Sequence, residues 1–246
     1  MSVEGPEIAV VVPVKNEAEN ILPLIEEIHV ALAGRMEFEI VYVDDGSDDD
    51  TPAILAEARK AFPRLHVVRH RAGCGQSQAV ATGVRHARAP LIATLDGDGQ
   101  NDPADIPAMV ERWRAAPEDQ RARLLIAGWR AKRRDTASKR VASRLANAIR
   151  ASLLKDDTPD TGCGAKLFTR EHFLDLPRFD HMHRFLPALT IRAGGRVESV
   201  KVNHRPRERG SSNYNNLRRA LVGVPDLLGA MWLMRRSRNP VVDIPE

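Results

Sequence analysis

This sequence of 246 residues has few aromatic residues, only two cysteines and no long apolar run. Aromatic residues make up 4% of the chain, but apolar residues together make up 43%, which is enough to build the core of one large domain. The two cysteines, Cys74 and Cys163, are far apart and belong to no Cys-x-x-Cys pair. Their placement argues against a zinc site or a disulfide framework and fits a reducing compartment.

No apolar run reaches the roughly 18 residues that a membrane-spanning helix needs. The start of the chain, residues 1–7, is short and acidic, so no signal peptide is expected. An interrupted apolar stretch at 217–236 has arginines at both ends, which predicts either a helix lying in a membrane surface or a helix packed on the protein. Residues 138–154 predict a basic amphipathic helix, for which the same two alternatives stay open.

Acidic and basic residues are distributed unevenly. Residues 1–120 hold 11 lysines and arginines against 21 aspartates and glutamates, whereas residues 121–246 hold 26 against 12. A basic half indicates an anionic partner, which is a nucleic acid, a phosphoryl ligand or a membrane surface. The basic half has no zinc-finger spacing and no strand pattern of basic and aromatic residues, so a nucleic-acid partner is disfavoured.

Strand-like and helix-like patterns alternate, and together they predict an α/β fold with a doubly wound, mostly parallel sheet and helices on both faces. The expected strands lie at residues 8–13, 38–43, 66–68, 90–95, 124–127 and 197–202. The expected helices lie at 19–33, 52–62, 76–87, 103–115, 138–154, from 170 onward, 183–193 and 217–236. The polar residues that follow the first, second and fourth strands should meet at one sheet edge and form a pocket. They are Asn16 and Glu17, Asp44 and Asp45, and Asp96 and Asp98.

The most informative stretch is Thr94-Leu95-Asp96-Gly97-Asp98-Gly99-Gln100, which follows directly on a buried strand. Two carboxylates at positions i and i+2 repel each other, and the glycines between them weaken any regular element. A divalent cation bound to a diphosphate explains both features, because Mg²⁺ and Mn²⁺ prefer hard oxygen ligands. A solvated turn of aspartates and glycines is the alternative.

A series of short motifs runs through residues 8–215. They are Val12-Pro13-Val14-Lys15-Asn16-Glu17, Val43-Asp44-Asp45-Gly46-Ser47, the glycine loop at Gly73 and Gly75, Asp96-Gly97-Asp98-Gly99-Gln100, Gly128-Trp129-Arg130, and Asp160-Thr161-Gly162 with Lys166-Leu167-Phe168. In this order they resemble family 2 glycosyltransferases of the GT-A fold. The motif from Arg207 to Tyr214 narrows the resemblance to polyprenyl-phosphate glycosyltransferases, the group that includes dolichyl-phosphate mannose synthase.

The resemblance implies a GT-A domain over residues 1–215, with a nucleotide-sugar half at about 1–120 and an acceptor half at 121–215. Residues 216–246 would form a C-terminal amphipathic segment at the membrane surface. Two motifs depart from the family pattern, since Lys166 stands where arginine is common and Ser212-Asn213 replaces the usual lysine region. The pair of C-terminal transmembrane helices found in many relatives is not expected here.

The resemblance also implies a role for each motif residue. The expected nucleotide-sugar-binding residues are Pro13, Val14, Asn16, Glu17, Asp45, Gly75, Gln76, Asp96, Gly97, Asp98 and Lys166. The expected metal ligands for Mg²⁺ or Mn²⁺ are Asp96, Asp98 and Gln100. The expected catalytic residues are Asp96, Asp98, Asp160 and Arg130, and the expected contacts to the acceptor phosphate are Arg130, Arg207, Arg209 and Ser211.

The implied reaction is an inverting transfer of a sugar from GDP-mannose or a UDP-sugar to a polyprenyl or dolichyl phosphate. The implied location is the cytoplasmic face of a membrane, as a peripheral protein; a membrane-protein partner subunit is left open. One alternative is a saccharide or lipid-linked oligosaccharide acceptor, and another is a subunit that binds nucleotide-sugar without turnover. A dinucleotide-dependent dehydrogenase is disfavoured, because no Gly-x-Gly-x-x-Gly follows the first strand.

Overall fold

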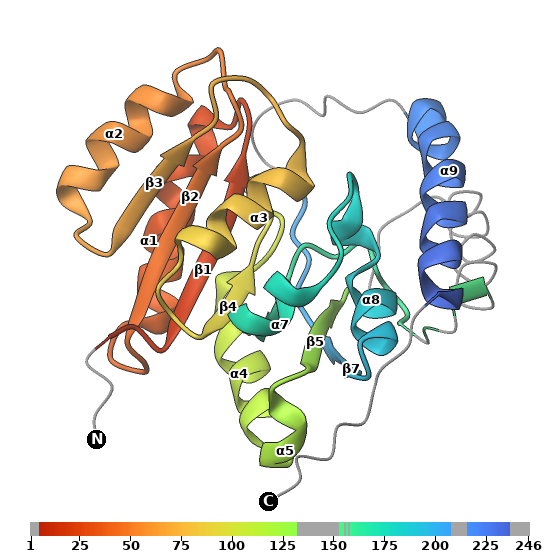
Figure 1. Cartoon of the computed structure of the whole chain (residues 1–246). Coiled ribbons are helices and arrows are strands. Elements are labelled where there is room, and N and C mark those ends of the chain that lie inside the picture. Colours follow the sequence, from red (N-terminus) through yellow and green to blue (C-terminus); the bar gives the residue numbers. More distant parts are fainter. Residues whose placement is uncertain (1–4, 132–152, 155, 157, 208–215, 237–246) are drawn as a thin grey trace, which may run out of the picture.

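A seven-stranded sheet with the order β3-β2-β1-β4-β6-β5-β7 forms the centre of the computed structural model (Figure 1). The structure describes residues 5–131, 153–154, 156, 158–207 and 216–236. The strands are β1 (Ile8–Val14), β2 (Phe38–Asp44), β3 (Leu65–Arg69), β4 (Leu91–Thr94), β5 (Leu124–Trp129), β6 (Lys166–Thr169) and β7 (Arg196–Lys201). The expected doubly wound, mostly parallel sheet is thus confirmed in these residues.

Helices cover both faces of the sheet. They are α1 (Ile21–Leu32), α2 (Thr51–Ala61), α3 (Gln76–His86), α4 (Ile106–Arg114), α5 (Glu118–Arg121), α7 (Arg170–Asp175), α8 (Leu186–Arg192) and α9 (Asn216–Arg235). The helix expected at 183–193 is split into a 3-10 turn, Met182–Arg184, and α8. In Figure 1, α2 and α9 lie at opposite ends of the molecule.

The core consists of two layers, one on each face of the sheet. Alternate side chains of a strand point to opposite faces, so Val10 and Val12 of β1 pack with α1, α2 and α4, whereas Ala9 and Val11 pack with α3. Four residues of β1 are completely buried, as expected for an apolar strand with parallel neighbours on both sides. These buried strands fix the edge at which the polar residues meet.

Strand β6 was not expected from the sequence, and it runs antiparallel to both of its neighbours. Lys166 at its start pairs with Thr94 at the end of β4. The beginning of β6 therefore lies at the same sheet edge as the end of β4. This reversal brings the segment that precedes β6 next to Asp96, which follows β4.

Some expectations fall outside the described residues. Most of the amphipathic helix expected at 138–154 lies there, as do the expected acceptor contacts Arg209 and Ser211. None of the helices in the described part of the chain combines the length and the apolar character needed to cross a bilayer.

Candidate active site

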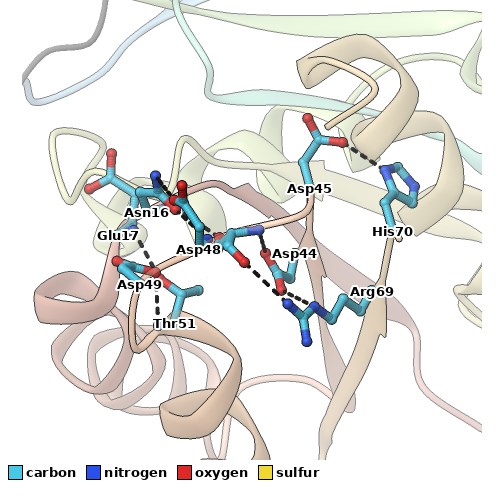
Figure 2. Close-up of polar contacts among 10 residues, drawn as sticks. Asn16, Glu17, Asp44, Asp45, Asp48, Asp49, Thr51, Arg69 and His70 are labelled. Carbon is cyan, nitrogen blue, oxygen red and sulfur yellow. Dashed lines mark hydrogen bonds and ion pairs between the residues drawn. The ribbon is translucent and has the colours of Figure 1, made fainter. Parts of the chain in front are cut away.

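The loops that follow β1 and β2 are joined by hydrogen bonds (Figure 2). The backbone N–H of Asn16 donates to Ser47 Oγ at 2.9 Å, and the Asn16 side-chain amide donates to Asp48 at 2.6 Å. Asn16 has a left-handed backbone with φ of 57°, a conformation that asparagine tolerates better than most residues. The N–H of Glu17 donates to Thr51 Oγ1 at 3.0 Å. The first two strand ends therefore meet as expected.

The two aspartates at the end of β2 have different surroundings. Asp44 is 1% exposed, accepts a hydrogen bond from the N–H of Ser47 at 2.9 Å and pairs with Arg69 at 3.0 Å. Asp44 therefore caps the turn after the strand. Asp45 points toward the glycine loop and accepts hydrogen bonds from the N–H groups of Cys74 at 2.7 Å and Gly75 at 2.8 Å. Its carboxylate holds this loop at the start of α3.

His70 is a residue of this site that the sequence did not predict. Its Nδ1 lies 2.7 Å from Asp45 Oδ1, and its Nε2 lies 2.9 Å from Thr82 Oγ1 (Figure 2 shows the contact with Asp45). Among the described residues, Asp45, His70 and Cys74 also form the one group of three His, Cys, Asp or Glu side chains whose potential ligand atoms all lie within 4.8 Å of one another. Hydrogen bonds already engage its carboxylate and imidazole, so we interpret the group as a support for the glycine loop.

Asp96 is held from three sides. Its N–H donates to Asn101 Oδ1 at 2.8 Å, and its Oδ1 accepts from Gln76 Nε2 at 2.8 Å. Gly164 lies so close that a Cβ atom at this position would be 2.2 Å from Asp96 Oδ2. Loss of water contact raises the pKa of Asp96, and the neighbouring charge of Asp98 adds to this rise. Gln76 and Asp96, both expected to bind the nucleotide-sugar, thus lie in contact.

Lys166 is buried next to this carboxylate and is only 4% exposed. Its ammonium group donates to the carbonyl oxygen of Cys163. Burial lowers the pKa of Lys166, while the negative charges of Asp96 and Asp160 act in the opposite direction. Lys166 is therefore a buried amine that interacts with two carboxylates of the site.

Arg130 and Asp160 form a bidentate ion pair on the second half of the site. Arg130 Nε lies 2.6 Å from Asp160 Oδ2, and Nη2 lies 2.8 Å from Oδ1. Their side chains are 10% and 6% exposed. The guanidinium of Arg130 is engaged with Asp160 in this structure, so its contact with an acceptor phosphate stays a prediction.

Asp98 lies at the open side of the site. Its Oδ1 accepts a hydrogen bond from the N–H of Gln100 at 3.1 Å, and its Oδ2 lies 3.8 Å from Arg207 Nη1. The other end of the Arg207 guanidinium donates to Glu17. Burial raises the pKa of Glu17, and hydrogen bonds from Asn20 and Arg207 oppose this rise. Arg207 thus contacts two residues that were expected to bind donor and metal.

The expected metal ligands fit a hard divalent cation. The side chain of Asp98 is 20% exposed, which leaves its carboxylate open to a small ion. The carboxylate of Asp98 and the amide oxygen of Gln100 are ligands that Mg²⁺ and Mn²⁺ accept. Asp96 lies deeper, and Gln76 and Gly164 restrict its position.

The fold and the arrangement of acids at the strand ends are those of a GT-A glycosyltransferase, and the comparison with known proteins agrees. Residues 9–176 match the family described as "Glycosyl transferase family 2". The chain therefore belongs to glycosyltransferase family 2, as its motifs predicted.

Two relatives define the part of the family to which the chain is similar. It is 34% identical over 246 residues to the dodecaprenyl-phosphate galacturonate synthase of Rhizobium johnstonii, covering 97% of this chain and 70% of that protein. It is 33% identical over 216 residues to an undecaprenyl-phosphate 4-deoxy-4-formamido-L-arabinose transferase of Enterobacter sp., covering 86% of this chain and 63% of that protein. The chain thus spans less than two thirds of the second relative.

Solved structures confirm the fold. A mannosyltransferase from Pyrobaculum calidifontis in complex with GDP-Man and Mn²⁺ has a TM-score of 0.66 at 21% identity, covering 97% of this chain and 67% of that chain. Glucosyl-3-phosphoglycerate synthase from Mycobacterium tuberculosis, in complex with Mg²⁺ and UDP, has a TM-score of 0.68 at 16% identity, covering 96% of this chain and 81% of that chain. The GT-A expectation is therefore confirmed.

Proposed function

We propose that this glycosyltransferase moves a sugar from a nucleotide-sugar to the phosphate of a polyprenyl phosphate, with inversion at the anomeric carbon. The observation that carries the proposal is the meeting of Asp96 and Asp98 with Asp160, Arg130 and Lys166 at one sheet edge. The names of the two relatives support a polyprenyl-phosphate acceptor. GDP-mannose and UDP-sugars are both retained as donors.

The proposed chemistry is a displacement that needs little proton transfer. An oxygen of the acceptor phosphate forms a bond to the anomeric carbon, and the bond from that carbon to the nucleoside diphosphate breaks. The acceptor phosphate is already ionised at neutral pH, so positioning and charge stabilisation are the main tasks of the protein. Asp45 holds the glycine loop against the donor, and Gln76 orients Asp96 beside the sugar.

Asp98 and Gln100, together with Asp96, would hold Mg²⁺ or Mn²⁺. When bound there, such an ion supplies positive charge to the leaving diphosphate. When protonated, Lys166 offsets the charge of Asp96, and the Arg130–Asp160 pair holds the ends of the acceptor-side segment together. The Mn²⁺ and Mg²⁺ in the similar structures support a metal requirement for this chain.

The proposed contact with the membrane is made by α9. Its outer side exposes Val224, Leu228 and Trp232, which are spaced four residues apart and are 59%, 60% and 59% exposed. The helix is fixed to the body of the protein by a contact between His181 Nδ1 and Asp226 Oδ2 at 2.9 Å and by a hydrogen bond from Arg192 of α8 to the carbonyl oxygen of Leu233. An exposed apolar stripe beside the basic residues that end α9 suits the surface of an anionic membrane. Both cysteines are free, which supports the cytoplasmic face.

The experiment that tests the proposal measures nucleotide release from a panel of GDP- and UDP-sugars. Each donor is incubated with Mg²⁺ or Mn²⁺, with and without polyprenyl phosphate. We expect one donor to release nucleotide only when the lipid is present. Release that does not depend on lipid would favour a saccharide acceptor, and tight donor binding without release would favour a non-catalytic subunit.

A further inference from the structure

The segment Asn203–Arg207, here called the strap, follows β7 and runs along the loop that carries Asp98. The N–H of Arg205 donates to the carbonyl oxygen of Gln100 at 3.0 Å, and Gln100 Nε2 donates back to the carbonyl oxygen of Arg205 at 3.3 Å. Asn101 and His204 form an antiparallel bridge between the two segments. The strap is therefore tied to the metal-binding loop by its backbone.

Side chains fix the first part of the strap as well. The N–H of Asn203 donates to Asp105 at 2.7 Å, and the Asn203 side chain donates to Asp102 at 3.0 Å. Arg205 pairs with Asp102 and with Glu27, the latter at 2.6 Å. Neither of these two carboxylates is among the expected ligands of donor or metal. Arg205 therefore has partners that substrate binding does not take away.

Arg207, at the end of the strap, contacts two residues that are expected to bind donor and metal. Its guanidinium contacts Glu17 after β1 and Asp98 after β4, and all three side chains are partly shielded from water. Exposed fractions of 22%, 14% and 20% for Arg207, Glu17 and Asp98 leave the group accessible to a small ion. A divalent cation on Asp98 would compete with the Arg207 guanidinium, because both are positively charged and would lie beside the same carboxylate.

We propose that Arg207 is the internal counter-cation of Asp98, that a divalent cation displaces it, and that its guanidinium then binds a phosphate oxygen of a substrate. The inference rests on the proposed function only for its last step, the identity of the phosphate. A guanidinium released beside a metal-bound carboxylate is suited to phosphate, with which it forms paired hydrogen bonds. The phosphate belongs either to the donor diphosphate or to the acceptor lipid.

The first test measures binding of Mn²⁺ alone to the full chain, from the loss of the electron paramagnetic resonance signal of free Mn²⁺. Arg207→Gln should bind Mn²⁺ about fivefold more tightly than the wild type, the upper range for a partly exposed ion pair. Arg205→Gln removes the same charge from the same strap and should leave the affinity within about twofold. Arg207→Lys keeps the charge and should also stay near the wild type.

An unchanged or weaker affinity in Arg207→Gln would overturn the proposal, and so would an equal gain in Arg205→Gln, which would indicate a general charge effect. Circular dichroism checks that each variant is folded. If Arg207→Gln does not fold, the Mn²⁺ affinities of Arg207→Lys and the wild type are compared instead. This binding measurement needs no sugar transfer, so its failure is distinct from failure of the proposed function.

The second test identifies the phosphate. Binding of GDP or UDP in the presence of Mn²⁺, and binding of a short-chain polyprenyl phosphate in detergent, are compared between wild type and Arg207→Gln. A loss of affinity of about tenfold for one of them assigns Arg207 to that phosphate, as expected for a charged hydrogen bond. No loss for either would overturn the last step of the proposal.

Discussion

At the scale of single residues, the site depends on Gly164 having no side chain. A Cβ atom there would lie 2.2 to 2.5 Å from the carboxylate of Asp96, so the carboxylate would have to move. We expect Gly164→Ala to lower transfer about 100-fold, because a misplacement of about 1 Å at a reacting centre has an effect of this size. Steady-state rates and thermal unfolding measured together separate lost positioning from lost folding.

Gly162 provides the matched control, since a Cβ atom there meets its nearest neighbours at 3.4 Å and 3.7 Å, which are ordinary contacts. Gly162→Ala should keep transfer within about threefold, as for most exposed substitutions. Equal losses in the two variants would show that the loop tolerates no side chain at all. In that case the contact between Gly164 and Asp96 would not be the cause.

A second prediction at this scale concerns Asp98. Asp98→Ala removes a hard oxygen ligand at the open side of the site, so metal-dependent transfer should disappear while the fold is kept. Asp119→Ala, on the exposed surface of α5, should leave transfer unchanged. Rates with and without added Mn²⁺ test the assignment, and near-normal transfer by Asp98→Ala would refute it.

At the scale of elements, a buried histidine links α7 to α8. His172 is 4% exposed, and its Nε2 lies 3.0 Å from Thr190 Oγ1. Burial, helped by the charge of Arg123, lowers the pKa of His172 to about 4. The unfolded chain therefore binds this proton at a higher pH than the folded protein. The stabilisation is complete above a pH of about 6.5 and is lost as the pH falls toward 4.

Protonation of His172 in the unfolded chain should therefore lower the free energy of unfolding by about 2 kcal/mol between about pH 7 and about pH 5. His172→Gln retains a hydrogen-bonding group toward Thr190 but does not titrate in this range, so it should lose correspondingly less. Urea unfolding of both proteins at the two pH values measures the difference. Parallel losses would mean that other groups cause the pH dependence.

Individual elements also show which parts of the fold and of the site could be predicted from the sequence. The strands β1, β2 and β4 end in polar motifs, and their apolar runs were enough to predict that these motifs meet. Strand β6 was missed because its four residues form a strand only through pairing with β4 and β5. His70 was missed because its role depends on β3 lying beside β2, which places it next to Asp45. Local sequence patterns do not reveal which distant segments pair with each other.

At the scale of the whole molecule, the proposed membrane face is the outer side of α9. Replacing Leu228 and Trp232 together by glutamate should weaken binding to vesicles with anionic lipid at least about tenfold, since burial of each large apolar side chain contributes about 1.5 to 3 kcal/mol. Val30→Glu changes an equally apolar residue on α1 that is 78% exposed and should have no effect. Co-sedimentation with vesicles measures both. Unchanged binding of the α9 variant would favour a helix that packs on protein.

Charge and motifs predict a nucleotide-sugar half and an acceptor half, but they do not predict which side chains of the two segments contact each other. The contacts of Arg130 and Arg207 with an acceptor phosphate, which the resemblance implies, stay a prediction; the structure pairs Arg130 with Asp160, and Arg207 with Glu17 and Asp98. Charge counts give the sign of a surface but not the partner of each side chain. The partner depends on the path of the strap and of the loop before β6.

The reversed direction of β6 has a consequence for how such enzymes diversify. The chain leaves the sheet edge after β5 and returns to the same edge before β6, so both ends of the intervening stretch are anchored within one small area. Gly164, at the end of that stretch, lies against Asp96, and Asp160 is buried in its ion pair with Arg130, so changes at these positions disturb the site. Relatives with different acceptors are therefore expected to retain the residues at these two anchors and to differ in the residues between them.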